Sequence, residues 1–140
     1  MAYIPTGAQW YIAEIVDQIT VEDDPRSVVH KNLVLIRADS PETAYEKALS
    51  FGRDSETDYD NPDGKQVHIR FRGLSDLNLI HGELEDGAEL MYEEKVGLTN
   101  ESIERLISTK ERLAVFCPIQ STKGPDYSSK EILDEMRKLL

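Results

Sequence analysis

The sequence predicts an α+β fold: an antiparallel sheet of four to five strands with one helix packed on one face, followed by C-terminal helices. Three observations favour this fold. Residues 10–21 are rich in β-branched and aromatic side chains, and residues 66–72 alternate between apolar and polar side chains, as half-buried strands do. Residues 40–52 carry helix signals, and no second helix is predicted between the strands of residues 10–95. An antiparallel meander therefore fits better than a parallel sheet, which needs a crossover between successive strands.

The first two strands are predicted to form a long hairpin. Residues 10–21 place most apolar side chains at alternate positions, interrupted by Asp17. A turn is expected at residues 22–27, where Pro25 prevents ladder pairing. Residues 31–38 contain the continuous apolar run LVLI, which is typical of a central strand. Such a strand would pair antiparallel with the first one.

The helix that follows has a well-defined start. Ser40 is expected to cap it, because its hydroxyl can accept a hydrogen bond from an amide that has no partner within the helix. Pro41 falls at the first helical position, where the missing N–H has no cost, and Glu42 adds negative charge at the positive end of the helix dipole. Gly52 is placed to end the helix. The apolar stripe expected to face the sheet consists of Ala44, Tyr45, Ala48 and Leu49.

The rest of the sheet is predicted after a polar loop at residues 55–64. Residues 66–72 alternate so that apolar side chains share one face and polar side chains the other. Residues 74–95 predict two more strands joined at Glu85-Asp86-Gly87, because an Asp-Gly pair is typical of a tight hairpin turn.

The C-terminal part is predicted to be helical with one short strand. Thr99 or Asn100 caps a second helix, and residues 113–119 suggest an edge strand closed by a proline. Residues 121–128 are typical of a linker, and Ser128 with Glu131 forms a capping box before a last amphipathic helix. We therefore expect one α+β domain over residues 1–118, with a linker and a C-terminal helix at 119–140. The inner sides of the two helices would carry Ile103, Leu106 and Ile107, and Ile132, Leu133, Met136, Leu139 and Leu140.

Charge and cysteine content limit the classes of partner and compartment. The net charge is −11, from 27 acidic and 16 basic residues, which argues against nucleic-acid binding and against an anionic membrane surface. The same charge permits a basic protein partner. The lone cysteine, Cys117, cannot form an internal disulfide, and we expect it to be buried and inert. No secretory signal and no apolar stretch of about 20 residues is present, so a cytoplasmic protein is expected.

Six acidic residues lie around the predicted hairpin turn. A pair of catalytic carboxylates needs two different environments, one of which raises a pKa, whereas water would solvate these side chains alike. We interpret them as a solvated face in preference to a docking surface for a basic partner, and acid–base catalysis is the least favoured reading. The candidate docking residues are Glu83, Glu85, Asp86, Glu89, Glu93 and Glu94.

Metal and cofactor sites find little support in the sequence. The acidic loop at residues 54–64 does not have the spacing of an EF-hand, which needs glycine at its sixth position. The three histidines have no ligand spacing, and one cysteine excludes zinc-ribbon patterns. Nucleotide-binding glycine loops and the nucleophile elbow of hydrolases are also missing. We therefore assign no catalytic residue, metal or cofactor.

One basic stripe stands out in this acidic chain. His68, Arg70 and Arg72 are predicted to project from the same face of one strand, roughly 7 Å apart along it. Such a stripe could bind an anion or a carboxylate. The favoured interpretation is that it forms ion pairs with acids on neighbouring strands, for which the acidic hairpin is the expected source.

Several segments together resemble a known family. The segments WYIAEIV at residues 10–16, LVLIRADSPETAYEKAL at 33–49, FRGLSDLNLI and ELEDGAEL resemble small bacterial proteins grouped as domain of unknown function forty-two eighty-eight. The likeness covers roughly residues 10–94. This resemblance implies a bacterial, cytoplasmic and non-enzymatic domain, and it assigns no activity to any residue.

Two functional classes follow from these observations. The first is a non-catalytic acidic interaction protein with a protein partner, of which an immunity-type inhibitor of a basic toxin, such as a nuclease, is a narrower version. The second is an enzyme with a scattered site around His68, Arg70, Arg72 and His81. A cleft that holds these residues with strongly shifted pKa values would favour the enzyme, and a flat acidic surface would favour the interaction protein.

Overall fold

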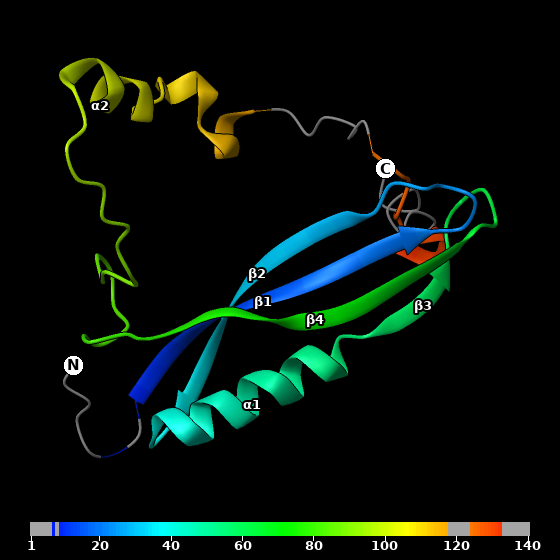
Figure 1. The fold of residues 1–140 in the computed structure, drawn as a ribbon, viewed down its shortest axis with the longest axis horizontal. Coiled ribbons are helices and arrows are strands. Elements are labelled where there is room, and N and C mark those ends of the chain that lie inside the picture. The colour runs from blue at the N-terminus through cyan, green and yellow to red at the C-terminus, as the bar shows by residue number, and fades with distance from the viewer. Residues whose placement is uncertain (1–6, 8, 118–123, 133–140) are drawn as a thin grey trace. The chain divides into compact units, whose positions relative to one another are not determined.

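A computed structural model describes residue 7, residues 9–117 and residues 124–132 of the chain (Figure 1). The chain divides into two compact units. The first unit contains Met1–Met91 and Gly124–Leu140, and the second contains Tyr92–Lys123. Most of the predicted C-terminal helix, residues 133–140, lies outside the described residues, as do residues 118–123 of the predicted edge strand and linker. A single domain over 1–118 stays a prediction.

The first unit is a four-stranded antiparallel sheet with one long helix, so the predicted α+β class is confirmed. Strand order in the sheet is β2-β1-β4-β3, which makes β2 and β3 its edges. The elements are β1 (Gln9–Val21), β2 (Val28–Ala38), α1 (Pro41–Asp54), β3 (Thr57–Asp60) and β4 (Gln66–Leu79).

The central strand β1 gives the sheet two different faces. It pairs with β2 in one unbroken register, from Gln9 opposite Ala38 to Ile19 opposite Val28. Alternate side chains of β1 are buried on one face, which we call the core face, and the opposite face of the sheet is called the open face. The buried set on the core face consists of Tyr11, Ala13, Ile15, Asp17, Ile19 and Val21, and Ile12 is buried on the open face.

Helix α1 starts where the sequence predicts, but it buries a narrower stripe. The amide of Thr43 donates a 3.1 Å hydrogen bond to the Ser40 hydroxyl, which confirms the cap. Ala44 and Ala48 belong to one buried cluster with sheet residues, whereas Tyr45 is 45% exposed. Gly52 does not end the helix, which continues to Asp54. A Cβ atom at Gly52 would lie 2.4 Å from the Phe71 ring, so close packing rather than termination accounts for this glycine.

The strands after α1 differ from the prediction. Part of the predicted polar loop forms β3, which pairs with the start of β4. Strand β4 is longer than predicted and contains two register shifts against β1, near Glu14 and Val16. These bulges change the parity of β4, so Phe71, Leu74 and Leu77 all lie opposite core-face residues of β1.

The hairpin predicted around Gly87 is wrong: residues 74–79 are strand, but as the end of β4, and residues 80–98 form no strand. The turn itself is present, since the Ala88 amide donates a 2.9 Å hydrogen bond to the Glu85 carbonyl. Within this turn the φ angle is positive at Gly87 but not at Asp86. A tight hairpin with the right strand twist needs positive φ at both central residues or at the first one, and other turns splay the flanking chain.

Residues 124–129, here called the C-terminal strap, pack on the sheet near the β1–β2 turn. Pro125 is buried, and Tyr127 contacts a second buried cluster formed by Ile19, Val21 and Val67. Two side chains of the β3–β4 region donate hydrogen bonds to strap carbonyls: Tyr59 to Tyr127, and Asn61 to Asp126 at 3.0 Å. The described part of the predicted linker is therefore bound to the sheet.

In its described residues, 92–117, the second unit contains only short helices. Thr99 caps α2 (Asn100–Leu106), because its hydroxyl accepts a 3.2 Å hydrogen bond from the Ser102 amide. Two 3₁₀ helices follow, η1 (Lys110–Arg112) and η2 (Ala114–Phe116), so the edge strand predicted there is wrong for its described residues. None of these three helices contains a buried residue.

Candidate interaction site

The predicted basic stripe lies on the open face and has acidic and amide partners in the sheet. His68 Nδ1 lies 2.5 Å and Arg70 Nη2 lies 2.8 Å from Asp58 Oδ1, and Arg72 donates a hydrogen bond to the Gln18 side chain. The hydrogen bonds from His68 and then from Arg70 lower the pKa of Asp58. Ion pairing across strands is thus present, although its source is β3.

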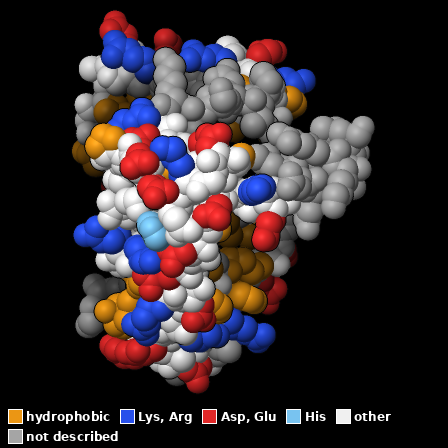
Figure 2. Space-filling model, turned by 90° about the vertical axis from the view of Figure 1, so that its right-hand side faces the viewer, with side chains coloured by type: hydrophobic (Ala, Val, Ile, Leu, Met, Phe, Trp, Pro, Cys, Tyr) orange, Lys and Arg blue, Asp and Glu red, His pale blue; other side chains and the backbone are white. Residues whose placement is uncertain are grey.

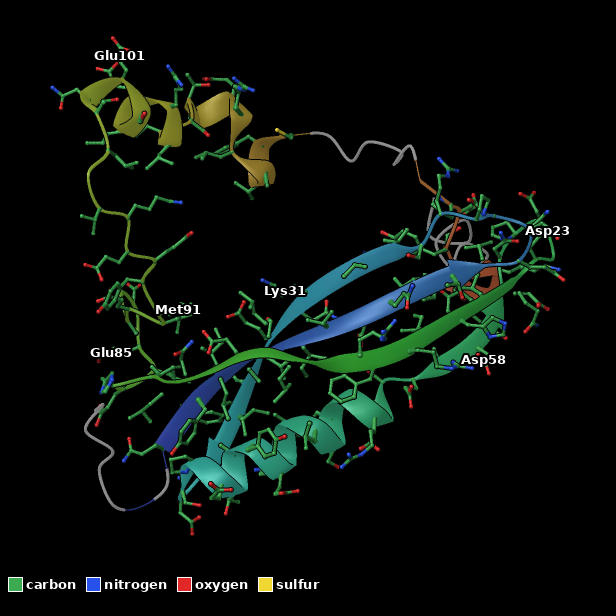
Figure 3. The ribbon with its side chains drawn as sticks, viewed as in Figure 1. Asp23, Lys31, Asp58, Glu85, Met91 and Glu101 are labelled. Atoms are coloured by element: carbon green, nitrogen blue, oxygen red, sulfur yellow. The ribbon has the colours of Figure 1, made fainter. Side chains whose placement is uncertain are left out.

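The acidic hairpin was the expected source of these ion pairs, and that expectation is wrong. Asp58 lies near one end of β4, and Glu85 follows the opposite end (Figure 3). Asp58 was not predicted as a partner of the basic stripe, because the loop around it has no sequence pattern typical of a strand. On the side of the molecule seen in Figure 2, acidic and basic side chains are interspersed.

His81 is not brought together with the basic stripe. It is exposed and lies beyond Leu79, where β4 ends, whereas His68 lies near the start of that strand. The eleven residue-to-residue steps from His68 to Leu79 span roughly 35 Å when the chain is extended. A single site that uses His81 together with His68, Arg70 and Arg72 is therefore not assembled.

The six candidate docking acids do not share one strand face. All of them are exposed, but four belong to the first unit and Glu93 and Glu94 belong to the second. Lys95 lies 3.3 Å from Glu93. Because residues 80–98 form no strand, the side chains are not aligned by strand parity as predicted. The four in the first unit are Glu83, Glu85, Asp86 and Glu89.

The core face contains a buried carboxylate that was not selected from the sequence. Asp17 is 5% exposed, and the Asn32 side chain donates a 3.1 Å hydrogen bond to its Oδ2. Its Oδ1 is buried without a hydrogen-bond partner among the described residues. Burial raises the pKa of Asp17. The one signal in the sequence was an acid at an apolar position of the strand.

His30 lies directly opposite Asp17 in the β1–β2 register. Its ring contacts Tyr127 of the C-terminal strap edge-on, with 5.3 Å between ring centroids. Asp17 and His30 therefore lie between two buried clusters: the one that contains Ala44 and Ala48 of α1, and the one that Tyr127 of the strap contacts. Within the described part of the chain, no group of three or more His, Cys, Asp or Glu residues is arranged to hold a metal ion.

Exposed apolar side chains are densest in the short second unit, which has nine large ones within residues 92–117. Every residue from 92 to 117 is exposed except Ser102, which is half-buried. Val96 is 85%, Val115 84% and Ile107 72% exposed. Cys117 is also exposed, so the expected buried thiol is wrong.

The chain matches one family model, Domain of unknown function (DUF4288), over residues 10–92. The protein belongs to the DUF4288 family. The match covers all four strands and α1, and it stops where the second unit begins. Apart from Tyr92, the exposed apolar residues of the second unit thus lie outside the DUF4288 match.

No curated protein and no solved structure matches the chain. Among the residues that the structure describes, none of the helices has both the length and the apolar character needed to cross a membrane.

Proposed function

We propose that this DUF4288 protein is a non-catalytic interaction module that binds a protein partner through its second unit. The observation that carries the proposal is the exposure of apolar side chains throughout residues 92–117. A seven-residue helix such as α2 is marginal on its own, and continuous exposed apolar surface is typical of a binding site. The side chains that a partner would cover are Tyr92, Val96, Leu98, Ile103, Leu106, Ile107, Leu113, Val115 and Phe116.

The distribution of charge supports a basic partner. The second unit has five acids and five bases, so its net charge is zero and the whole charge of −11 belongs to the first unit. A basic surface on the partner would be attracted by the first unit, which carries the net negative charge. An inhibitor of a basic toxin, such as a nuclease, is the narrower form of this proposal. The five acids are Glu93, Glu94, Glu101, Glu104 and Glu111, and the five bases are Lys95, Arg105, Lys110, Arg112 and Lys123.

We place the protein in the bacterial cytoplasm. Its one cysteine is exposed and cannot form an internal disulfide, which suits a reducing compartment. The length of β4 separates His81 from His68, Arg70 and Arg72, which argues against an enzyme site built from these four residues.

Partner capture tests the proposal. The tagged protein is incubated with lysate of its source organism, and captured proteins are identified by mass spectrometry. The double variant Ile107→Lys with Val115→Lys should lose the partner, because both side chains are exposed and charge would oppose their burial. The purified partner should then bind the parent protein with a negative heat-capacity change, the marker of apolar burial.

The matched control is Tyr45→Lys with Phe51→Lys on α1, where the two side chains are 45% and 47% exposed. This variant gains the same charge and should retain the partner. Thermal unfolding of both double variants should match the parent. Equal capture by all three proteins, or enrichment of no protein above an untagged control, would contradict the proposal.

A further inference from the structure

The outer edge of β2 is long and has no strand neighbour among the described residues. It extends over eleven residues, and its register with β1 contains no bulge. No proline interrupts it. On the other side of the sheet β3 has only four residues, and the part of β4 beyond it contains two bulges. Sheet proteins normally protect an edge of this length, because its free N–H and C=O groups can pair with another strand.

The side chains of β2 define what could pair with it. The strand has no acidic residue but contains His30, Lys31 and Arg37, although the chain as a whole is strongly acidic. Its open face carries three exposed apolar side chains: Val29 at 61%, Leu33 at 58% and Leu35 at 45%. A complementary strand would therefore be acidic, with apolar residues at intervals.

The same chain contains such a segment in residues 88–94. Apolar Leu90, Met91 and Tyr92 lie between Glu89 and the pair Glu93 and Glu94, yet the segment forms no strand. Its apolar side chains are exposed, by 45%, 41% and 75%. The sequence is thus suited to a strand, and what the segment lacks is a neighbour to pair with.

The connection to this segment has enough length to reach another molecule. Ile80 is 1% exposed and its amide donates a 2.9 Å hydrogen bond to the Trp10 carbonyl, so the chain is fixed to the sheet up to that point. Beyond it, residues 81–87 can span at most about 25 Å when extended.

We propose that residues 88–94 of one molecule pair antiparallel with the β2 edge of a second copy, and that the exchange is reciprocal. An alignment with Glu93 opposite Lys31 puts Met91 opposite Leu33 and Leu90 opposite Val34. In this register Glu93 faces Lys31 and Glu94 faces His30, Met91 and Leu90 face apolar side chains, and Leu35 faces Glu89. Reciprocal exchange closes a two-fold dimer in which each copy contributes both elements. Direct pairing of β2 with β2 would instead bring two basic strands together. The dimer goes beyond the proposed function and does not depend on it.

Sedimentation equilibrium of the purified full chain over a concentration series tests the dimer. The parent should self-associate to the dimer mass. Lys31→Glu should weaken the association by about tenfold or more, because it replaces an attraction with a repulsion. The same result is expected for Glu93→Lys, and the double variant Lys31→Glu with Glu93→Lys should recover association.

A second pair of variants does not rely on charge pairing. Leu33→Lys should abolish the dimer, whereas Phe51→Lys, the same change at a comparably exposed position on α1, should leave it intact. Thermal unfolding of each variant checks the fold, because Lys31 also lies 3.6 Å from Glu14. A parent that is monomeric at all concentrations would overturn the inference. A dimer that persists in the Leu33→Lys variant would also overturn the inference. So would a double variant, Lys31→Glu with Glu93→Lys, that associates no better than Lys31→Glu alone.

Because no lysate protein is present in these measurements, the dimer and the proposed function can fail separately. A monomer that still captures a partner through its second unit would remove the dimer alone. A dimer that captures nothing would remove the proposed function alone.

Discussion

Helices α1 and α2 begin alike but end in different surroundings. Each has a hydroxyl cap, Ser40 or Thr99, an acid in the first turn and a base in the last. Helix α1 has fourteen residues and buries Ala44, Ala48 and Gly52, whereas α2 has seven and buries none. The cap therefore determines where a helix starts. Contact with a sheet determines whether it is long and whether its apolar side chains leave water.

The largest expected effect comes from truncating a buried isoleucine to alanine, compared with the same change at an exposed isoleucine on α2. Ile36 is 1% exposed in the cluster that contains Ala44 and Ala48, and Ile103 is 44% exposed on α2. Ile36→Ala should lower the free energy of unfolding by about 2–5 kcal/mol, because it deletes buried groups and leaves a cavity. Ile103→Ala should change it by less than about 0.5 kcal/mol. Urea unfolding measures both, and similar losses would show that α2 is packed as α1 is.

The next test compares the two caps. Ser40→Ala removes the acceptor of the Thr43 amide and should cost about 1 kcal/mol of unfolding free energy. Thr99→Ala removes the equivalent hydrogen bond, but α2 should unfold locally without moving the main transition. Unfolding curves and hydrogen exchange at the amides of the two helices distinguish these outcomes. An equal shift of the main transition would contradict the comparison.

The smallest expected effect is the change in stability caused by Asp17, the charged residue among the buried side chains of the core face. Burial raises the folded-state pKa of Asp17 above its unfolded value of about 3.9. The folded state therefore binds the proton more tightly, and ionised Asp17 lowers stability at neutral pH. Asp17→Asn should unfold at higher urea than the parent near neutral pH. The difference should shrink as pH falls through the folded pKa toward the unfolded one. A difference that grows on acidification would contradict this prediction.

Some features were fixed by residues close together in the sequence. The caps at Ser40 and Thr99, the turn at Gly87 and the β1–β2 hairpin were all predicted, because each depends on a few neighbouring side chains and backbone angles. The family resemblance was also correct, since the DUF4288 match covers residues 10–92.

Other features were decided only by the tertiary structure. Strand β3 was hidden in a polar loop because it gains its hydrogen bonds from β4, and residues 88–94 alternate like a strand but have no neighbour in the first unit's sheet. Asp58 pairs with Arg70 for the same reason, because β3 brings it there. The sequence by itself determined where turns and helices start. Which segments pair, and which side chains leave water, depended on neighbours distant in the chain, because hydrogen bonding between strands and apolar burial both need a partner surface.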